Sequence, residues 1–344
     1  TLEFPLTYEY KKRFAREHRV LPAKNYEKNF ETLCEQIGPP SRVMRWCCTV
    51  HKSVPTMLKL RELCSDGEDT LALVFDGVRA EESERRSHYS EISNGKHINQ
   101  INCSPIFTWN TGEIFLYILS RNILFNKAYR YGSNRVGCTI CPLSSGWRDS
   151  ICNYVYPEEL APLLDRVKQY GKNMGVSDKA MRGYIEAGRW KSRAGGRGME
   201  NGGNRVYEVI SDDKIIFNFT ESTQDWIEVA RILGPITERN AFNGEQIIKG
   251  KAFQFTVENE NGLKVTYGPK SNMDRFIISW LRGIAYKVAY CAGCKTCVVE
   301  CPTGAFSVDE NSKIRIDTTK CVHCYKCLTE IEKSCKLARC LTTT

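Results

Sequence analysis

The chain has 344 residues, of which 42% are hydrophobic and 26% charged, a globular composition with room for two or three domains. Its formal charge of +9 favours anionic partners such as nucleotides, sulfated or phosphorylated substrates or nucleic acid, and is equally compatible with a surplus of solvated lysines. No run of about 18 apolar residues occurs and no export signal opens the sequence, so we expect a cytoplasmic protein that does not span a membrane.

The first 150 residues alternate helical and strand-like patterns. Residues 25–38 predict an amphipathic helix, residues 70–80 a buried strand that runs into a loop, and residues 111–124 a helix with Thr111 as N-cap. This alternation is typical of an α/β domain with a mostly parallel sheet. We expect that domain to cover residues 1–150.

The middle of the chain predicts two further regions. Residues 151–205 read as helices followed by a basic loop at 189–205, rich in Gly and Arg, for which a flexible linker is favoured over an anion-binding loop. Residues 206–269 predict a small α+β domain that ends in a hairpin around "ENENG". An amphipathic helix at 270–287 then leads into a cysteine-rich domain at 270–344.

The C-terminal region places cysteines at metal-ligand spacings. "CAGCKTCVVECP" has the pattern C-x2-C-x2-C-x3-C-P, and "CVHCYKC" repeats its opening. The cysteines are Cys291, Cys294, Cys297, Cys301, Cys321, Cys324 and Cys327. Thiolates at two-residue gaps reach three irons of one cubane, whereas zinc modules use four ligands in pairs. Iron is therefore favoured over zinc, and reduced thiolates over disulfides.

This pattern resembles bacterial two-cluster ferredoxin domains over about residues 286–344. The resemblance implies two [4Fe-4S] clusters that relay electrons. One would bind Cys291, Cys294, Cys297 and a cysteine of the second half; the other would bind Cys321, Cys324, Cys327 and Cys301. The second half departs from the family pattern, because Ile331 occupies the expected fourth position. We expect Cys335 to replace it, with Cys340 as the alternative.

Two further cysteine pairs lie in the first domain. "RWCCTVHK" places Cys47 beside Cys48, and "RVGCTICP" supplies Cys138 and Cys141. Adjacent cysteines rarely form an unstrained disulfide. Four thiolates in two close pairs can hold one cubane if the backbone bends tightly, and zinc on the same thiolates is the competing interpretation.

These pairs resemble the CC…CxxC cluster motif of the adenylylsulfate and phosphoadenylylsulfate (PAPS) reductase family. Residues 75–87, "FDGVRAEESERRS", resemble that family's G-x-R-x-x-E-S-x-x-R segment, and residues 105–142 resemble its closing stretch. Residues 2–5, "LEFP", resemble the segment after its third strand. The resemblance implies an adenine-nucleotide α-hydrolase-like α/β fold, here incomplete, and a third [4Fe-4S] cluster.

Sulfate and phosphosulfate groups present tetrahedral oxygens that arginine binds bidentately and lysine attracts as a point charge. For any one of the candidate arginines and lysines taken alone, a surface or ion-paired role is about as well supported as a role in substrate binding. The candidate catalytic residues are Arg45, Lys52, Arg79 and Arg86. The same four, with Glu82, Ser83 and Trp109, are the candidate substrate-binding residues.

Two features of the reductase family are absent from this sequence. The glycine-rich "SGGKDS"-type loop, which binds the phosphate side of the nucleotide, does not occur. We therefore expect a segment or a second chain that carries it. The Glu-Cys-Gly-type tail cysteine is also missing, with Cys340 a weak substitute, so the clusters themselves are expected to deliver electrons to the substrate.

Three functions follow as hypotheses. The first is a reductase that converts a sulfonucleotide into sulfite and an adenine nucleotide, with electrons from a low-potential donor. The second is a sulfur transferase of DNA phosphorothioation or tRNA thiolation that acts through an adenylylated intermediate, with nucleic acid as partner. The third is an electron-transfer subunit without catalysis. No membrane partner is expected.

Overall fold

The computed structural model describes residues 3–23, 29–64, 71–95, 100–132, 135–240, 242–259 and 262–343. The chain forms two compact units, the first comprising Thr1–Asn25 and Pro55–Ile140 and the second Tyr26–Val54 and Cys141–Thr344. Cys138 therefore belongs to the first unit, whereas Cys47, Cys48 and Cys141 belong to the second.

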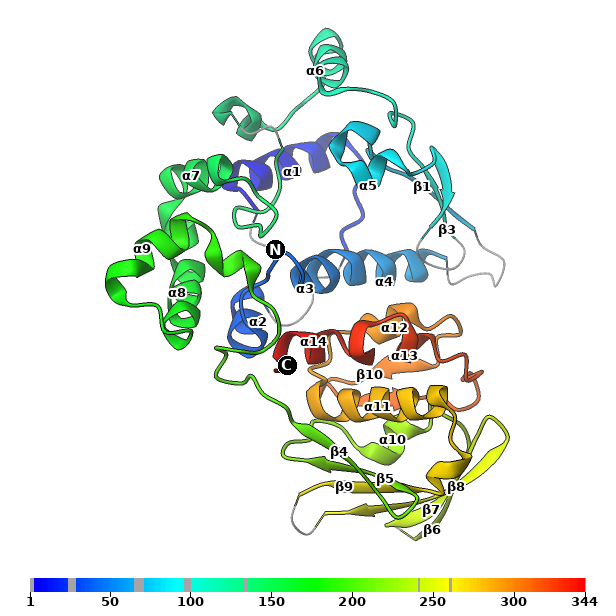
Figure 1. The fold of residues 1–344 in the computed structure, drawn as a ribbon. Coiled ribbons are helices and arrows are strands. Elements are labelled where there is room, and N and C mark those ends of the chain that lie inside the picture. The colour runs from blue at the N-terminus through cyan, green and yellow to red at the C-terminus, as the bar shows by residue number, and fades with distance from the viewer. Residues whose placement is uncertain are drawn as a thin grey trace. The chain divides into compact units, whose positions relative to one another are not determined.

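The first unit combines helices with a small mixed sheet (Figure 1). Its elements are α1 (Pro5–Glu17), all but the first residue of α4 (Val54–Leu63), β1 (Ala72–Phe75), η2 (Ala80–Glu82), α5 (Glu84–Ser87), β2 (Ile92–Asn94), β3 (Gln100–Cys103), α6 (Thr111–Ser120) and η3 (Lys127–Tyr131). The strand order is β1-β3-β2. Strands β1 and β3 are parallel, and β2 and β3 antiparallel.

Two sequence predictions in this unit need correction. Among the described residues the sheet is mixed rather than mostly parallel, because the short connection between β2 and β3 allows only an antiparallel pairing. Helix α6 is capped by Asn110 rather than Thr111. The Asn110 side chain accepts the Glu113 N–H at 3.0 Å, and the Glu113 carboxylate accepts the Asn110 N–H at 2.7 Å. This reciprocal pair is a capping box, for which Asn serves well.

The helical part of the second unit contains the vicinal cysteines, which lie on α3. It contains α2 (Phe30–Ile37), α3 (Trp46–Cys48), the π-helical turn η1 (Thr49–Ser53), α7 (Gly146–Val155), α8 (Pro157–Asn173), α9 (Asp178–Glu186) and η4 (Arg189–Ser192). Helix α2 corresponds to the helix predicted at 25–38, of which residues 25–28 lie outside the described residues. Leu160, Leu163 and Val167 line the buried face of α8 at helical spacing. No helix in the described residues is long and apolar enough to cross a membrane.

A six-stranded antiparallel sheet forms the next part of the second unit. Its strands are β4 (Val206–Ser211), β5 (Lys214–Phe219), β6 (Ile236–Asn240), β7 (Asn243–Ile248), β8 (Lys251–Glu258) and β9 (Lys264–Gly268), in the order β4-β5-β9-β8-β7-β6. The predicted hairpin is β8 paired with β9, although residues 260–261 of its turn lie outside the described residues. Trp226 of α10 (Trp226–Ala230) stacks on Phe217 and closes the buried side of the sheet.

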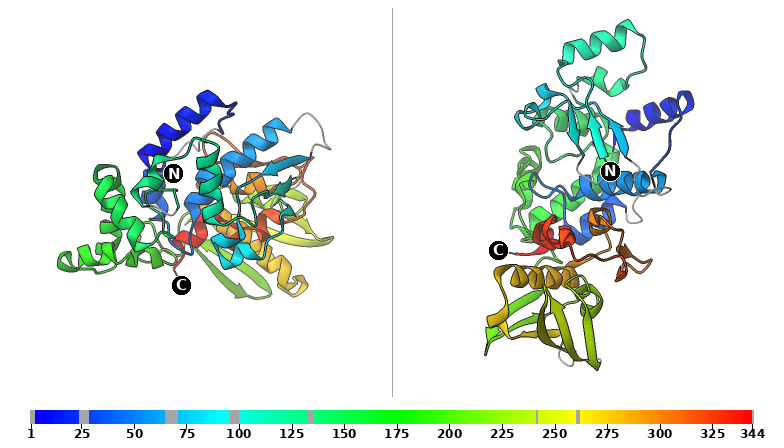
Figure 2. Two further views of the ribbon diagram at one scale, coloured as in Figure 1. Left: turned by 90° about the horizontal axis from the view of Figure 1, so that it is seen from above. Right: turned by 90° about the vertical axis from the view of Figure 1, so that its right-hand side faces the viewer.

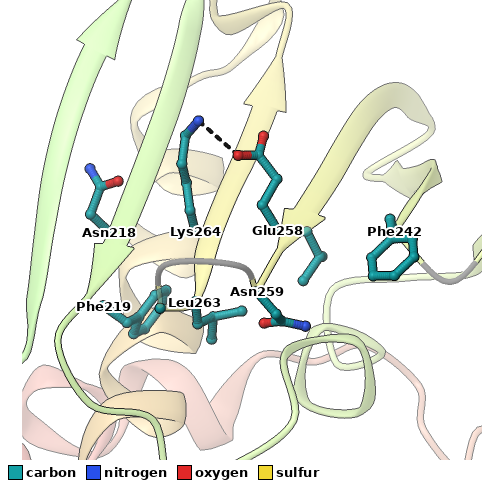
Figure 3. Close-up of a pocket in the computed structure, with 9 residues that line it drawn as sticks. Asn218, Phe219, Phe242, Glu258, Asn259, Leu263 and Lys264 are labelled. Atoms are coloured by element: carbon teal, nitrogen blue, oxygen red, sulfur yellow. Dashed lines mark hydrogen bonds and ion pairs between the residues drawn. The ribbon is translucent and has the colours of Figure 1, made fainter.

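A cavity of about 840 Å³ opens at one end of this sheet (Figure 3). Lys264 and Glu258, which lie across its rim, pair with each other at 3.0 Å. Phe219, Phe242 and Leu263 supply much of its apolar lining. None of the described residues that line the cavity is a cysteine, so the cavity is separate from the candidate cluster sites.

The C-terminal part of the second unit begins with α11 (Arg275–Tyr290), which lies on the same side of the six-stranded sheet as α10 (Figures 1 and 2). The short helix η5 (Lys270–Asn272) precedes α11. The elements that follow α11 are α12 (Thr296–Glu300), β10 (Phe306–Val308), β11 (Ile314–Ile316), α13 (Lys326–Thr329), η6 (Glu332–Ser334) and α14 (Lys336–Leu341). Strands β10 and β11 form an antiparallel ribbon between the two cysteine motifs. Each motif therefore continues from a loop into a short helix.

Candidate iron-sulfur and substrate sites

One group of thiols gathers where α11 ends, with Cys294 and Cys335 buried and Cys291 and Cys297 partly exposed. Burial raises the pKa of Cys291 well above its usual value, and the neighbouring thiolates of Cys335, Cys294 and Cys297 raise it further. Burial likewise raises the pKa of Cys335 to about 12, with Cys294 and Cys297 among the groups that act on it. The structure thus brings Cys335, the residue before α14, to the first cysteine motif.

The remaining cysteines of the two motifs form a second group. The pKa of Cys321 is raised by burial and by the thiolates of Cys301 and Cys324. The pKa of Cys327 is raised to about 12 by burial, and Cys297, Cys301 and Cys324 lie among the charges that act on it. Cys301, from the end of the first motif, is therefore a neighbour of the second motif.

The donor sets fit iron–sulfur clusters. Besides burial, neighbouring thiolates raise the pKa of Cys291 and Cys335 in the first group and of Cys321 and Cys327 in the second, so as thiolates the members of each group require a strongly positive centre between them. In the described part of the chain, no three His, Cys, Asp or Glu side chains are arranged to hold a single metal ion. A cubane binds its four thiolates through four different irons and separates them more widely than one ion does. A cluster of this kind supplies one-electron chemistry.

The vicinal cysteines are held by the tryptophan before them. Trp46 is fully buried, donates its indole N–H to the Gly38 carbonyl at 3.1 Å and stacks on Phe30 with ring centroids 5.3 Å apart. Cys47 and Cys48 end the short helix α3, which continues directly into the π-helical turn η1. Such turns are rare and frequently mark functional sites.

Cys48 lies on an exposed, positively charged face. Arg45, Cys48 and Lys52 are all exposed and follow one another at helical spacings of three and four residues. The pKa of Cys48 is lowered to about 6, chiefly by a hydrogen bond from Cys47 and, against the effect of burial, by the charges of Lys52, Arg45 and Lys336. This face suits a thiolate and an anionic ligand.

The loop that carries Cys141 is fixed by Lys191. The Ser144 N–H and hydroxyl donate to the Cys141 carbonyl at 3.0 Å and 2.6 Å. The Lys191 ammonium is 3.0 Å from the Ser144 hydroxyl, donates to the Ser144 carbonyl at 3.2 Å, and pairs with Asp149. The Lys191 carbonyl in turn accepts the Arg42 N–H at 2.9 Å. Lys191 therefore joins the Cys141 loop to the segment that leads to Cys47.

The loop at 189–205 is packed rather than flexible, which corrects the expectation of a plain linker. Trp190, Lys191 and Arg193 are each only 3% exposed. Arg193 donates to the carbonyls of Ile37 and Cys340, both at 2.6 Å, and to a third carbonyl, that of Pro39, at 2.8 Å. Composition alone concealed this role, because Gly-rich, Arg-rich sequences are typical of both linkers and tight turns.

In the first unit, the candidate substrate residues follow the carboxyl ends of the parallel strands, where ligands of α/β sheets bind. Arg79 comes after β1 and Trp109 after β3. The Arg79 guanidinium is 3.1 Å from Glu81, 3.4 Å from the Trp109 carbonyl and 3.3 Å from the Thr111 hydroxyl. The structure therefore brings Arg79 and Trp109 together, with the arginine engaged in protein contacts.

A second cluster surrounds Glu82. Its carboxylate pairs with Arg86 and lies 3.3 Å from Arg135. Ser83 is the N-cap of α5 and accepts the Arg86 N–H at 3.3 Å. Cys138 forms an isolated antiparallel bridge with Glu3 in the same unit. Arg135 opens the segment "RVGCTICP" but was not singled out by sequence reasoning, and Lys191, Arg193 and Lys336 were missed as well.

Comparisons with known proteins match both ends of the chain. Residues 1–144 match the family described as Phosphoadenosine phosphosulfate reductase domain, and residues 284–330 match the 4Fe-4S dicluster domain family. Two uncharacterized proteins of Methanocaldococcus jannaschii are 29% and 26% identical to this chain over 191 residues, which is 55% of the chain and 44% and 38% of those proteins. The chain thus spans about two fifths of the length of these curated relatives.

A functionally named relative matches a shorter stretch. An adenosine 5'-phosphosulfate reductase of Neisseria meningitidis serogroup A is 31% identical over 106 residues, which is 30% of this chain and 39% of that enzyme. This relative and the domain matches agree with both family resemblances of the sequence. The chain therefore carries a phosphoadenosine phosphosulfate reductase domain at residues 1–144 and a 4Fe-4S dicluster domain at residues 284–330.

Proposed function

We propose that the chain is an iron–sulfur reductase, or part of one, that converts adenylylsulfate or its 3′-phosphorylated form to sulfite and an adenine nucleotide. The bond between the sulfur and the bridging phosphate oxygen breaks, two electrons reduce the sulfur, and the nucleotide leaves with its phosphate. The electrons come from a low-potential donor through the dicluster domain. The observation that most strongly supports this proposal is that a reductase domain and a dicluster domain occur in one chain.

Contacts within the second unit support an electron path from the C-terminal cysteine motifs to the vicinal cysteines Cys47 and Cys48. Arg193 ties the Cys340 carbonyl of α14 to the Ile37 carbonyl at the end of α2. The charge of Lys336, next to Cys335, lowers the pKa of Cys48, together with the closer effects of Cys47, Lys52 and Arg45. We infer that the cluster on Cys335 is the one that faces the vicinal cysteines.

Three [4Fe-4S] clusters are proposed, held by three sets of cysteines. The first set is Cys291, Cys294, Cys297 and Cys335; the second is Cys301, Cys321, Cys324 and Cys327; the third is Cys47, Cys48, Cys138 and Cys141. The neighbouring thiolates that raise the pKa of Cys291, Cys335, Cys321 and Cys327 support the first two sets. Anaerobically prepared protein should then contain about twelve irons per chain, and about eight would remove the third cluster.

The arginine and lysine side chains are proposed to bind the anionic substrate. Arg45 and Lys52 flank Cys48 on its exposed face, and Arg79 and Arg86 stand after β1. A further segment, on the same polypeptide or on a partner, is proposed to supply the glycine-rich loop. The edge strand β1 supports this, because Leu73 and Phe75 are 54% and 67% exposed, as expected for a strand that another segment covers.

The test is an anaerobic assay of the intact natural assembly with a reduced low-potential donor and each sulfonucleotide in turn. Release of sulfite from one of them, matched by the corresponding nucleotide, establishes the reductase and its substrate. A fully metallated assembly that releases no sulfite would overturn the proposal. Sulfur transfer to a DNA or tRNA probe, with binding that weakens steeply as salt rises, would then support the alternative transferase.

A further inference from the structure

Lys287 is a fully buried cation between the two cysteine motifs of the dicluster domain. It lies on α11, one turn before Cys291, and is 1% exposed. Its ammonium donates to the Cys297 thiol at 2.8 Å and to the Ser334 carbonyl. The Phe306 ring lies 5.5 Å away and shields the charge from water. A buried ammonium is costly unless it is paired with an anion, and Cys297 as a thiolate is the contacting partner that can carry that charge.

The sequence of α11 explains how the second motif reaches this lysine. Gly283 lies one turn before Lys287 and therefore on the same face of the helix. A Cβ atom at Gly283 would stand 2.3 Å from the Ser334 hydroxyl, so only glycine allows this approach. Ser334 belongs to the segment that departs from the usual ferredoxin spacing and ends in Cys335. The small size of Gly283 allows this segment to pack against α11.

The charge of Lys287 acts on both groups of thiols. The Lys287 ammonium contacts Cys297 and the carbonyl of Ser334, which directly precedes Cys335. On the same face of α11, Gly283 lies against Leu328 of α13, the residue after Cys327. Cys297 and Cys335 belong to the first proposed cluster, and Cys327 to the second. One fixed positive charge is therefore shared between the ligands of two neighbouring clusters.

We propose that Lys287 sets the reduction potentials of both dicluster-domain clusters, raising each above the value it would have without this charge. One-electron reduction makes a cluster and its thiolates more negative by one charge, and a buried cation with an N–H···S bond stabilises that added charge. The effect should be larger for the cluster on Cys297, which Lys287 contacts directly. This inference rests on the iron–sulfur part of the proposed function and not on the identity of the substrate.

The experiment is a redox titration of the full chain, followed by electron paramagnetic resonance, with iron content measured on the same samples. We compare the wild type with K287M, which removes the charge at similar length, and K287R, which keeps it. K326M is the matched control, because Lys326 is exposed and adjacent to Cys327 but screened by water. Sulfonucleotide is left out, so failure of the reductase assay does not affect the result.

The expected result is that K287M lowers both midpoint potentials at unchanged iron content, that K287R restores them, and that K326M leaves them unmoved. Unchanged potentials in K287M would overturn the proposal, as would a K287R variant that behaves like K287M. If K287M fails to hold its iron, K287Q decides, because glutamine retains an N–H donor without the charge. A wild-type potential in K287Q would equally overturn it.

Discussion

The guanidinium of Arg193 donates to the main-chain carbonyl of Cys340 at 2.6 Å, and the same nitrogen reaches the carbonyl of Ile37 at 2.6 Å. A residue from the basic loop thus fastens α14, the last helix of the chain, to the segment that leads to the vicinal cysteines. Ile37 and Cys340 are each 1% exposed, so their carbonyls depend on Arg193 rather than on water for a donor.

Replacing Arg193 by leucine should destabilise the protein strongly. Three buried carbonyls, including that of Pro39, would lose their donor, and each unpaired group costs about 1–3 kcal/mol. We expect a loss of about 3 kcal/mol or more in the free energy of unfolding, measured by urea denaturation. Arg197→Leu is the control, because Arg197 lies in the same loop but is exposed. Equal stability of the two variants would contradict the role assigned to Arg193.

The cysteine motifs can be recognised in the sequence because their spacing is local. Cys291, Cys294 and Cys297 lie within one loop, so residue type and gap already imply the ligand geometry. Arg193 could not be predicted in the same way, since its partners at Ile37 and Cys340 are more than a hundred residues away. The same holds for Lys191, whose surroundings are set by packing rather than by any repeated pattern.

The choice between Cys335 and Cys340 as the last ligand can be tested directly. Cys335 neighbours Cys294 and Cys297, whereas the Cys340 thiol donates to the Lys336 carbonyl within α14 at 3.5 Å. We expect C335S to lose about four irons per chain, or to convert one cubane to a three-iron form. C340S should keep the full complement. Iron analysis and resonance spectra distinguish the two, and loss of iron in C340S alone would reverse the assignment.

The proposed anion-binding role of Arg86 predicts a selective loss of substrate affinity. Arg86 is half-buried and pairs with Glu82, whereas its neighbour Arg85 is exposed. Removal of a charge-assisted hydrogen bond costs about 1.5–3 kcal/mol, which is about tenfold or more in affinity. We therefore expect Arg86→Leu to raise the KM for the sulfonucleotide by at least about tenfold in the intact assembly. Arg85→Leu should change it little. Equal effects would assign Arg86 to the ion-pair network alone.

Replacement of Lys191 should disturb only the proposed third cluster, the one that includes Cys141. Its ammonium holds Ser144, which in turn bonds the Cys141 carbonyl, and its own carbonyl holds the segment that precedes Cys47. Lys191→Met keeps the length of the side chain but removes the bonds to Ser144 and Asp149, leaving buried polar groups unpaired. The Cys141 loop should then lose its fixed position, and the proposed third cluster would lose Cys141 as a ligand.

We expect K191M to contain about eight irons per chain where the wild type contains about twelve, with the two dicluster-domain signals intact. The exposed Lys179 provides the control, because K179M removes the same charge from the surface of α9 without touching the loop. Iron analysis and low-temperature resonance spectra of anaerobic samples make the measurement. A K191M protein with the full iron content would show that the Cys141 loop holds its geometry without this lysine, whereas loss of all iron would point to general unfolding.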